Sequence, residues 1–328
     1  MMKHGLIIAL SLSLSCLSLH AQEDKMDFGL ETRVSYTVPG SFAFDYCALY
    51  AKGALGDKFS YYMYGYPNKI STSASFFDAL SWGMLTYAPA EHFKIEFGKQ
   101  MIEYAGTEYD YKPIDIFAPA EYWNNYPAFQ LGLTGQYLND SGDIFSVQIS
   151  QSPFRKYSTG KEFYAYSVSA RGSRDVFGYS ASFNALEYSD NAYVGHEVLS
   201  GWAFLGPVKL ELDLINRSEL SRFELFKDYT MVSQAILDLG NGVKVFGKFS
   251  KDRNASDAQF DYMVRQGADL TGLTAGLLWY PESAGGNVRL HVYYSSVRGT
   301  QPSLSGALKP GTSLLNLGAT WNISFIHR

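Results

Sequence analysis

Cysteine and histidine are scarce in this 328-residue sequence, which has two cysteines and six histidines. No two histidines lie within metal-ligand spacing of each other, so a zinc site has no ligand set. The sequence also lacks HExxH, GxSxG, GxxxxGK[ST] and GxGxxG, and hydrolase and nucleotide-binding functions therefore have no supporting motif. We predict no catalytic residue, no metal and no cofactor.

Charged residues are also few, at 18% of the chain, with 27 Lys or Arg against 32 Asp or Glu. This slightly acidic balance offers no general attraction for nucleic acid, and a hydrophobic content of 46% excludes a disordered chain. Beyond residue 22 no run of 18 apolar residues occurs, which excludes an α-helical membrane protein. Aromatic residues are abundant instead, with 25 Tyr and 22 Phe, and they favour strands over helices.

Residues 1–21 differ from the rest of the chain. They have a basic start, an apolar run too short to span a bilayer, and Ala21 at a plausible cleavage point. We predict a signal peptide over 1–21 and a mature domain over 22–328. A lipoprotein anchored at Cys16 is the alternative, but the residues before it depart from the usual motif. After cleavage Cys47 has no partner for an internal disulfide.

Apolar and polar residues alternate with period two along the mature chain, most clearly over 315–325. In the clearest stretches every charged residue falls on one parity, that is, on one of the two faces of the strand. Lipid on the other face enforces this separation. A Lys or Arg on the lipid face costs about 2–4 kcal/mol at the bilayer midplane. The charged parity predicts a pore wall that includes Lys94, Glu96, Lys209, Glu211, Asp213, Lys244, Lys248 and Arg289.

About sixteen alternating stretches can be counted, with 14–18 as the range. They start near residues 27, 42, 59, 79, 92, 127, 143, 162, 175, 193, 207, 229, 243, 268, 287 and 313. A soluble β-sandwich also alternates, but it has fewer strands, and here the apolar parity carries many Tyr and Phe.

The connections between stretches alternate in length as well, with one exception at the first. Tight, turn-rich segments follow every second stretch. The longer segments between them are 67–78, 100–126, 153–161, 186–192, 217–228, 252–266 and 298–312. Outer-membrane barrels show this pattern. We predict an all-β fold, a transmembrane antiparallel β-barrel surrounded by lipid in the outer membrane of a Gram-negative bacterium.

The longest connection, residues 98–129, follows the fifth stretch and mixes Pro, aromatic and charged residues. A loop of this length can pack against the inner wall of the barrel and narrow the pore. Its candidate constriction residues, between 100 and 126, are Glu103, Glu108, Asp110, Lys112, Asp115 and Glu121. Five carboxylates against one lysine would concentrate cations, so we predict a weak cation preference. The alternative is that these carboxylates only bind backbone amides or wall cations and hold the loop.

Four short motifs occur in this connection: Gly98-Lys99-Gln100, Glu108-Tyr109-Asp110, Pro113-Ile114-Asp115 and Glu121-Tyr122-Trp123-Asn124-Asn125. In these motifs the sequence resembles porins related to the phosphate-selective porins O and P, especially those of Gram-negative anaerobes. The resemblance covers the fifth to the sixth strand well and the rest only in architecture. It implies a sixteen-stranded channel, often a homotrimer, with the third loop as its constriction. Those porins crowd Lys and Arg at the constriction, whereas this loop is acidic, so the motifs do not extend the resemblance to phosphate selectivity.

We therefore predict a passive diffusion porin for small hydrophilic solutes or ions, and not an enzyme. Two other functions stay open at this point. A barrel fully blocked by its third loop would act as a surface scaffold or receptor, which partners bind through its outer loops. A lipid-processing enzyme would need a cluster of Ser, His and amide side chains on the lipid parity, and the sequence shows none there.

Overall fold

The computed structural model describes residues 26–67, 79–155, 160–256, 263–302 and 306–327. The predicted signal peptide lies outside the described residues. The strands are β1 (Met26–Val38), β2 (Phe42–Leu55), β3 (Phe59–Gly65), β4 (Leu80–Ala90), β5 (Phe93–Met101), β6 (Phe129–Leu138), β7 (Ile144–Gln151), β8 (Tyr164–Ser173), β9 (Phe177–Ser189), β10 (Ala192–Leu205), β11 (Val208–Glu219), β12 (Asp228–Gly240), β13 (Val243–Asn254), β14 (Asp269–Trp279), β15 (Val288–Thr300) and β16 (Thr312–His327).

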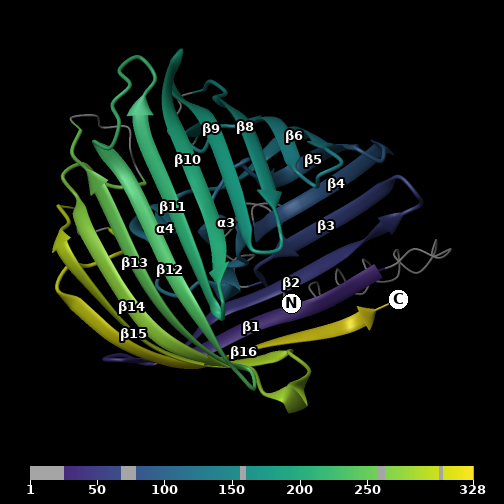
Figure 1. Ribbon diagram of the computed structural model, residues 1–328. Helices are drawn as coiled ribbons and strands as arrows, with labels where there is room; N and C mark the ends of the chain where they lie inside the picture. Colours follow the sequence, from purple (N-terminus) through teal and green to yellow (C-terminus); the bar gives the residue numbers. More distant parts are fainter. Residues whose placement is uncertain (1–25, 68–78, 156–159, 257–262, 303–305, 328) are drawn as a thin grey trace, which may run out of the picture.

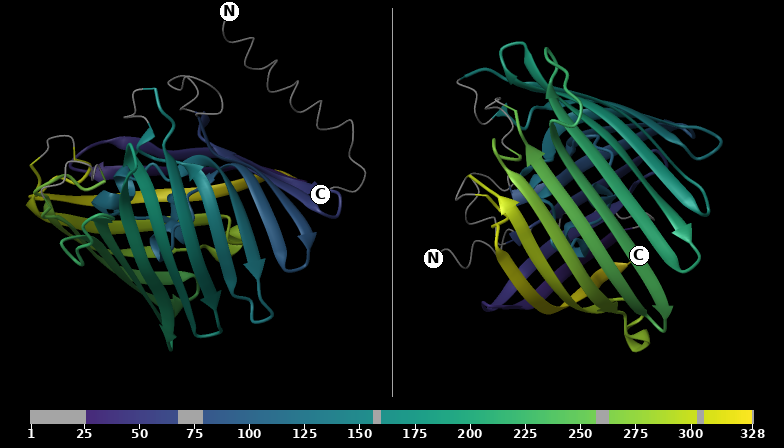
Figure 2. Two further views of the ribbon diagram at one scale, coloured as in Figure 1. Left: turned by 90° about the horizontal axis from the view of Figure 1, so that it is seen from above. Right: turned by 60° about the vertical axis from the view of Figure 1, so that its left-hand side comes forward.

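The strands form one closed antiparallel barrel (Figures 1 and 2). Each strand pairs with its neighbours in the sequence, and β1 closes the ring by pairing with β16, which leaves no free edge. The predicted sixteen-stranded barrel is confirmed, and every strand begins within two residues of its predicted start. Alternation and turn residues locate strands well because both signals change where a strand ends.

Burial along the strands is inverted relative to a soluble sheet, as β7 shows. Its apolar Phe145, Val147 and Ile149 are 46%, 60% and 42% exposed, whereas its polar Ser146 and Gln148 are both 5% exposed. A soluble sandwich would bury the apolar face and expose the polar one. Apolar residues outside and polar residues inside are the arrangement of a barrel in lipid.

The two ends of the barrel carry connections of different length, with the first connection, residues 39–41, as the exception. At the short-turn end, two residues join β10 to β11 and two join β12 to β13. Asn241 and Gly242 of the second of these turns have positive φ, and a Cβ on Gly242 would lie 2.1 Å from the Tyr280 carbonyl oxygen. At the long-loop end, residues 102–128 join β5 to β6 and residues 255–268 join β13 to β14. In outer-membrane barrels the short turns face the periplasm.

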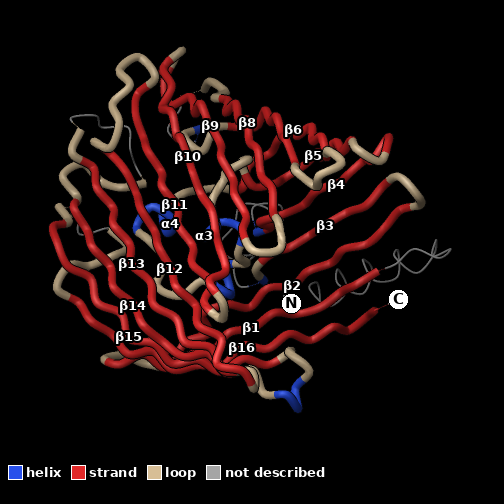
Figure 3. The backbone as a smooth tube through the Cα atoms, in the orientation of Figure 1, coloured by secondary structure: helices blue, strands red, loops and turns tan. Residues whose placement is uncertain are grey.

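Residues 102–128, called the β5–β6 segment from here on, carry three short helices: α3 (Thr107–Asp110), the 3-10 turn η2 (Pro113–Asp115) and α4 (Glu121–Asn125). Figure 3 shows the helices of this segment in blue against the red strands of the wall. A further 3-10 turn, η4 (Glu282–Ala284), precedes β15. Within the described residues, no helix has the length and apolar character to cross a membrane.

Candidate functional site

Aromatic side chains attach the β5–β6 segment to the wall. Tyr104 and Tyr122 are fully buried, and their ring centroids lie 5.2 and 5.3 Å from that of Tyr126, which Tyr122 meets in a stacked geometry and Tyr104 in a tilted one. The Tyr122 hydroxyl and Nδ1 of His196 on β10 are hydrogen-bonded at 2.7 Å. The apolar wall residues of the same buried cluster include Leu186, Val194, Val198 and Ile215. One cluster of buried hydrophobic residues therefore lies between the segment and β9–β11.

Two wall carboxylates bind the first turns of the two α-helices in the segment. Asp213 of β11 accepts hydrogen bonds from the backbone N–H groups of Thr107 at 2.7 Å and Glu108 at 2.9 Å, where α3 begins. Asp252 of β13 accepts the first two N–H groups of α4 at 2.9 and 3.2 Å. These N–H groups have no partner inside a helix, and a carboxylate also suits the positive end of the helix. Both carboxylates therefore fix where the segment sits.

Two predicted constriction carboxylates pair with predicted wall cations. Glu108 contacts Lys248 of β13, and the two side chains are only 6% and 4% exposed. Burial raises the pKa of the Glu108 carboxyl above its ordinary value of 4.5, although Lys248 opposes this shift. Asp115 lies 2.6 Å from the Arg289 guanidinium of β15. These contacts connect α3 and η2 to the wall on the β13–β15 side.

The other charged residues near the start of the segment are also paired. Arg171 of β8 lies 3.1 Å from Asp110 and 3.6 Å from Glu103, so one guanidinium serves two carboxylates. Lys112 contacts Glu31 of β1, which is itself buried. Such pairing agrees with the alternative interpretation of the loop, in which its carboxylates bind wall cations and hold the segment in place.

Glu121 has backbone amides as partners. Its carboxylate is fully buried and accepts hydrogen bonds from the N–H groups of Ala307 at 3.1 Å and Leu308 at 2.6 Å. Asn125, four residues later in α4, also donates to it at 2.8 Å. Glu121 therefore joins the segment to the connection between β15 and β16.

Two arginines of the wall hold the backbone of η2 and of the residue that follows it. Arg33 of β1 donates hydrogen bonds to the carbonyl oxygens of Ile114 and Ile116, both at 3.0 Å. Arg289 donates to the same Ile114 oxygen at 2.9 Å. The Phe117 ring lies close to both guanidinium groups, with its centroid 5.4 Å from Arg33 and 5.1 Å from Arg289. This contact fixes the ring of Phe117.

Tyr111 lies between α3 and η2 and contacts β11. Its hydroxyl donates a hydrogen bond to Glu211 and accepts one from Lys209 at 3.2 Å. Lys209 and Glu211 also pair with each other at 2.6 Å. Burial raises the pKa of Tyr111, so its hydroxyl stays protonated. Of the other predicted wall residues, Lys244 pairs with Asp238 at 3.5 Å.

The structure does not bring Lys94 and Glu96 into this group. Both lie on β5, where Lys94 is exposed and Glu96 accepts a hydrogen bond from Gln136 at 3.4 Å. Neither lines the two cavities described next. We find no group of His, Cys, Asp and Glu within the described ranges that could hold a metal ion.

Tyr111 lines two cavities of similar size. The first, of about 510 Å³, lies between the segment and β10–β15 and is called the β10–β15 cavity. It reaches the short-turn end, since Pro207 and Asp238 line it. The second, of about 520 Å³, lies between the segment and β2–β6 and is called the β2–β6 cavity. It adjoins the long-loop end, since Tyr66 and Leu80 line it.

Several residues of this site are not among those predicted from the sequence. Asp252 was assigned to a connection starting at 252, whereas β13 continues to Asn254. The signal was present, because Asp252 has the same parity as Lys248. Glu31 and Arg33 likewise share one parity of the first strand, so alternation places them on the wall but does not show what they bind.

No known family model matches this sequence, and no curated protein does. Solved structures match most of the chain. The anion-selective porin of Comamonas acidovorans covers 92% of this chain and 100% of its own length, with a TM-score of 0.68 and 11% identity. The fold is that of a porin.

Two more porin-fold structures agree. OmpT, an outer membrane protein of Vibrio cholerae, covers 93% of this chain and 99% of its own, with a TM-score of 0.64 and 11% identity. OmpF of Salmonella typhi, solved with daunomycin, covers 92% of this chain and 97% of its own, with a TM-score of 0.61 and 13% identity. At such identities the likeness shows the fold alone. It does not single out the phosphate-selective group.

Proposed function

We propose that this protein is a passive diffusion channel of the outer membrane for small hydrophilic solutes and ions, with no catalysis. In this proposal the β5–β6 segment is the inward-folded third loop that narrows the lumen. The observation that carries the proposal is the pair of cavities that share Tyr111 within a closed sixteen-stranded barrel. A solute from the long-loop end would pass the β2–β6 cavity, then Tyr111, then the β10–β15 cavity.

The many fixed contacts of the segment support a constriction of constant width. Asp213 and Asp252 bind its two α-helices, and Arg33 holds the backbone after η2. A loop bound to β1, β11 and β13 has anchors on well-separated parts of the ring. The size limit then follows from the space beside Tyr111, and no gating motion is needed.

The charges of the β10–β15 cavity support only weak ion selectivity. Its lining has four carboxylates and four cations, and each carboxylate has a cation partner. The pairs are Glu108 with Lys248, Asp115 with Arg289, Glu211 with Lys209 and Asp238 with Lys244. Because the pairs cancel, the field that passing ions meet is small. We retain as the proposal the weak cation preference predicted from the carboxylates of the β5–β6 segment.

Two finer points extend this proposal. The same pairing argues against strong phosphate selectivity, because every cation lining the β10–β15 cavity already has a carboxylate partner. For assembly, OmpT of Vibrio cholerae has a trimer form. We propose a homotrimer for this chain too, and analytical ultracentrifugation in detergent would distinguish three copies from one.

Single-channel recording in a planar bilayer, with a salt gradient across it, tests the function. The refolded protein should give stable open steps, and the reversal potential should be small and of the sign for cations. Heat modifiability, a change of gel mobility on heating, shows whether the barrel is folded. A folded barrel that never conducts would contradict the proposal. It would favour the blocked barrel that serves as a scaffold or receptor.

A further inference from the structure

Apolar side chains interrupt the polar inner face in the short-turn half of β12–β14. Ile236 of β12 and Phe246 of β13 are directly opposite each other, and Leu278 of β14 packs in the same cluster. Apolar surface that stays in contact with water costs about 25 cal/mol per Å². Phe117 of the segment covers part of this wall, with its ring 5.6 Å from that of Phe246. Ile236 and Tyr280 remain partly exposed where they line the β10–β15 cavity.

Two ion pairs in this cavity differ in burial. Lys248 and Glu108 are 4% and 6% exposed, so removing either partner would leave a buried charge unpaired. Lys244 and Asp238 are 3.5 Å apart and 40% and 52% exposed. A pair this exposed contributes only about 0–1 kcal/mol. A solute can therefore replace the contact between Lys244 and Asp238 at little cost in free energy, while the buried pair of Lys248 and Glu108 stays intact.

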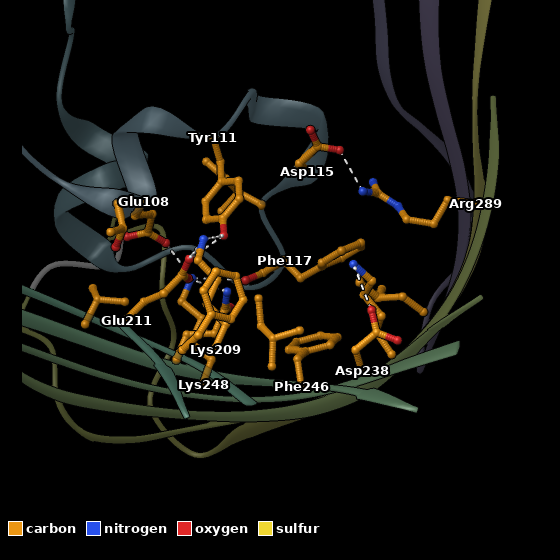
Figure 4. Close-up of a pocket in the computed structure, with 18 of the residues that line it drawn as sticks. Glu108, Tyr111, Asp115, Phe117, Lys209, Glu211, Asp238, Phe246, Lys248 and Arg289 are labelled. Atoms are coloured by element: carbon orange, nitrogen blue, oxygen red, sulfur yellow. Dashed lines mark hydrogen bonds and ion pairs between the residues drawn. The ribbon is translucent and has the colours of Figure 1, made fainter. Parts of the chain in front are cut away.

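Figure 4 shows how these groups lie. Phe246 stands on the wall between Lys248 and Asp238, and Phe117 lies above it. Lys244, which pairs with Asp238, also lies near an aromatic ring, with Nζ 5.7 Å from the centroid of Tyr280. One exposed cation, one exposed anion and an apolar wall thus meet at the short-turn side of the cavity.

We propose that the β10–β15 cavity binds zwitterionic amino acids with an aromatic or branched apolar side chain. The solute's carboxylate would contact Lys244, its ammonium group Asp238, and its side chain Ile236 and Tyr280. The lining has equal numbers of acidic and basic groups, so a solute with a single charge can satisfy only one of the two exposed groups, whereas a zwitterion satisfies both. A volume of about 510 Å³ also lies in the range of about 300–1,000 Å³ for small-molecule sites. This proposal rests on the proposed channel function and names a substrate class for it.

Isothermal titration of the refolded full chain in detergent micelles tests the binding directly. Four probes separate its components: phenylalanine, glycine without the apolar side chain, 3-phenylpropionate without the ammonium group, and phenethylamine without the carboxylate. Phenylalanine should bind roughly tenfold tighter than each of the other three, because it alone uses all three contacts. In planar bilayers phenylalanine should also interrupt the current briefly, and glycine should not.

Three variants test the assigned contacts. Lys244→Gln should move the preference toward phenethylamine, and Asp238→Asn should move it toward 3-phenylpropionate. Ile236→Asn should lower the affinity for phenylalanine to that for glycine. Lys94→Gln is the matched control, because this wall lysine lies outside the cavity and its loss should change none of these affinities.

Equal binding of phenylalanine and glycine would overturn the proposal, and so would binding that neither Lys244→Gln nor Asp238→Asn alters. Tightest binding of 3-phenylpropionate would also overturn it and would indicate a site for organic anions. A channel that conducts without binding phenylalanine would refute this inference alone. A barrel that binds phenylalanine and never conducts would refute the channel function alone.

Discussion

The two cavities that meet at Tyr111 differ in charge although they are almost equal in volume. Among the residues that the structure describes, eight Asp, Glu, Lys and Arg side chains line the β10–β15 cavity, whereas two, Asp45 and Lys99, line the β2–β6 cavity. The β2–β6 cavity is instead rich in aromatic rings, namely Tyr46, Tyr66, Trp82, Tyr109, Tyr111, Trp123, Tyr126 and Phe129. In the proposed channel, charge would therefore act on a solute mainly at the short-turn side of Tyr111. On the other side the lining would select by shape and polarity.

One segment contributes to both linings. The part around α3 and η2 gives Glu108 and Asp115 to the β10–β15 cavity and Tyr109 to the β2–β6 cavity. The part around α4 gives Trp123 to the β2–β6 cavity. Asp213 anchors α3 and Asp252 anchors α4, so separate wall carboxylates position the part that lines both cavities and the part that lines only the β2–β6 cavity.

Asp213→Ala is expected to change the difference between the two cavities most. The change removes an anchor that accepts hydrogen bonds from Thr107 N–H, Thr107 Oγ1 and Glu108 N–H, each contributing about 1.5–3 kcal/mol when the acceptor is charged. We expect α3 to detach, with a higher and noisier single-channel conductance. The matched control is Asp252→Ala, which should disturb α4 and leave the ion selectivity of the β10–β15 cavity nearly unchanged. Wild-type conductance in Asp213→Ala would show that the segment does not limit the current.

Tyr111→Ala should have the next largest effect, because it removes the side chain that both cavities share. Joining the cavities should raise conductance on the order of twofold, since pore diameter sets the barrier. Tyr111→Phe is the control: it keeps the ring and loses only the hydrogen bonds to Glu211 and Lys209. If single-channel recording finds the alanine variant no more conductive than the phenylalanine variant, the narrowest point lies elsewhere.

The barrel could be predicted from sequence because its signals are local. Each strand alternates by itself, and each turn carries its own Gly, Asn or Pro, so strand starts were correct to within two residues. The error at Asp252 was also local: the connection was drawn from residue 252, two residues inside the true end of β13 at Asn254.

The partners within the site were not predictable in the same way. Lys112 and Glu31 are 81 positions apart, and Lys248 and Glu108 are 140 apart. Periodicity assigns Lys248 to the wall but contains no information on which loop residue lies opposite it. The path of the β5–β6 segment through space decides that. For this reason the acidic excess of the loop could be read from the sequence, but its pairing with cations of the wall could not.

Selectivity variants of smaller effect test the charge difference between the cavities. Glu211→Gln removes a carboxylate of the β10–β15 cavity and leaves Lys209 without it, so the reversal potential should move toward anions by roughly several millivolts. Asp45→Asn changes the β2–β6 cavity, where Asp45 pairs with Arg33 at 3.4 Å, and should move the reversal potential less. An equal shift for both variants, measured in the same salt gradient, would mean that the two cavities contribute alike.

The smallest expected effect is a pH dependence from Glu108. Burial raises its carboxyl pKa above 4.5, so on acidification Glu108 takes up a proton at a higher pH than an exposed glutamate. Protonation removes a negative charge and leaves Lys248 positive, so the reversal potential should move slightly toward anions, beginning above pH 4.5. Glu108→Gln should already show that shift at neutral pH and should lose the added pH dependence. A wild-type shift that begins only below pH 4.5 would instead assign the titration to exposed carboxylates.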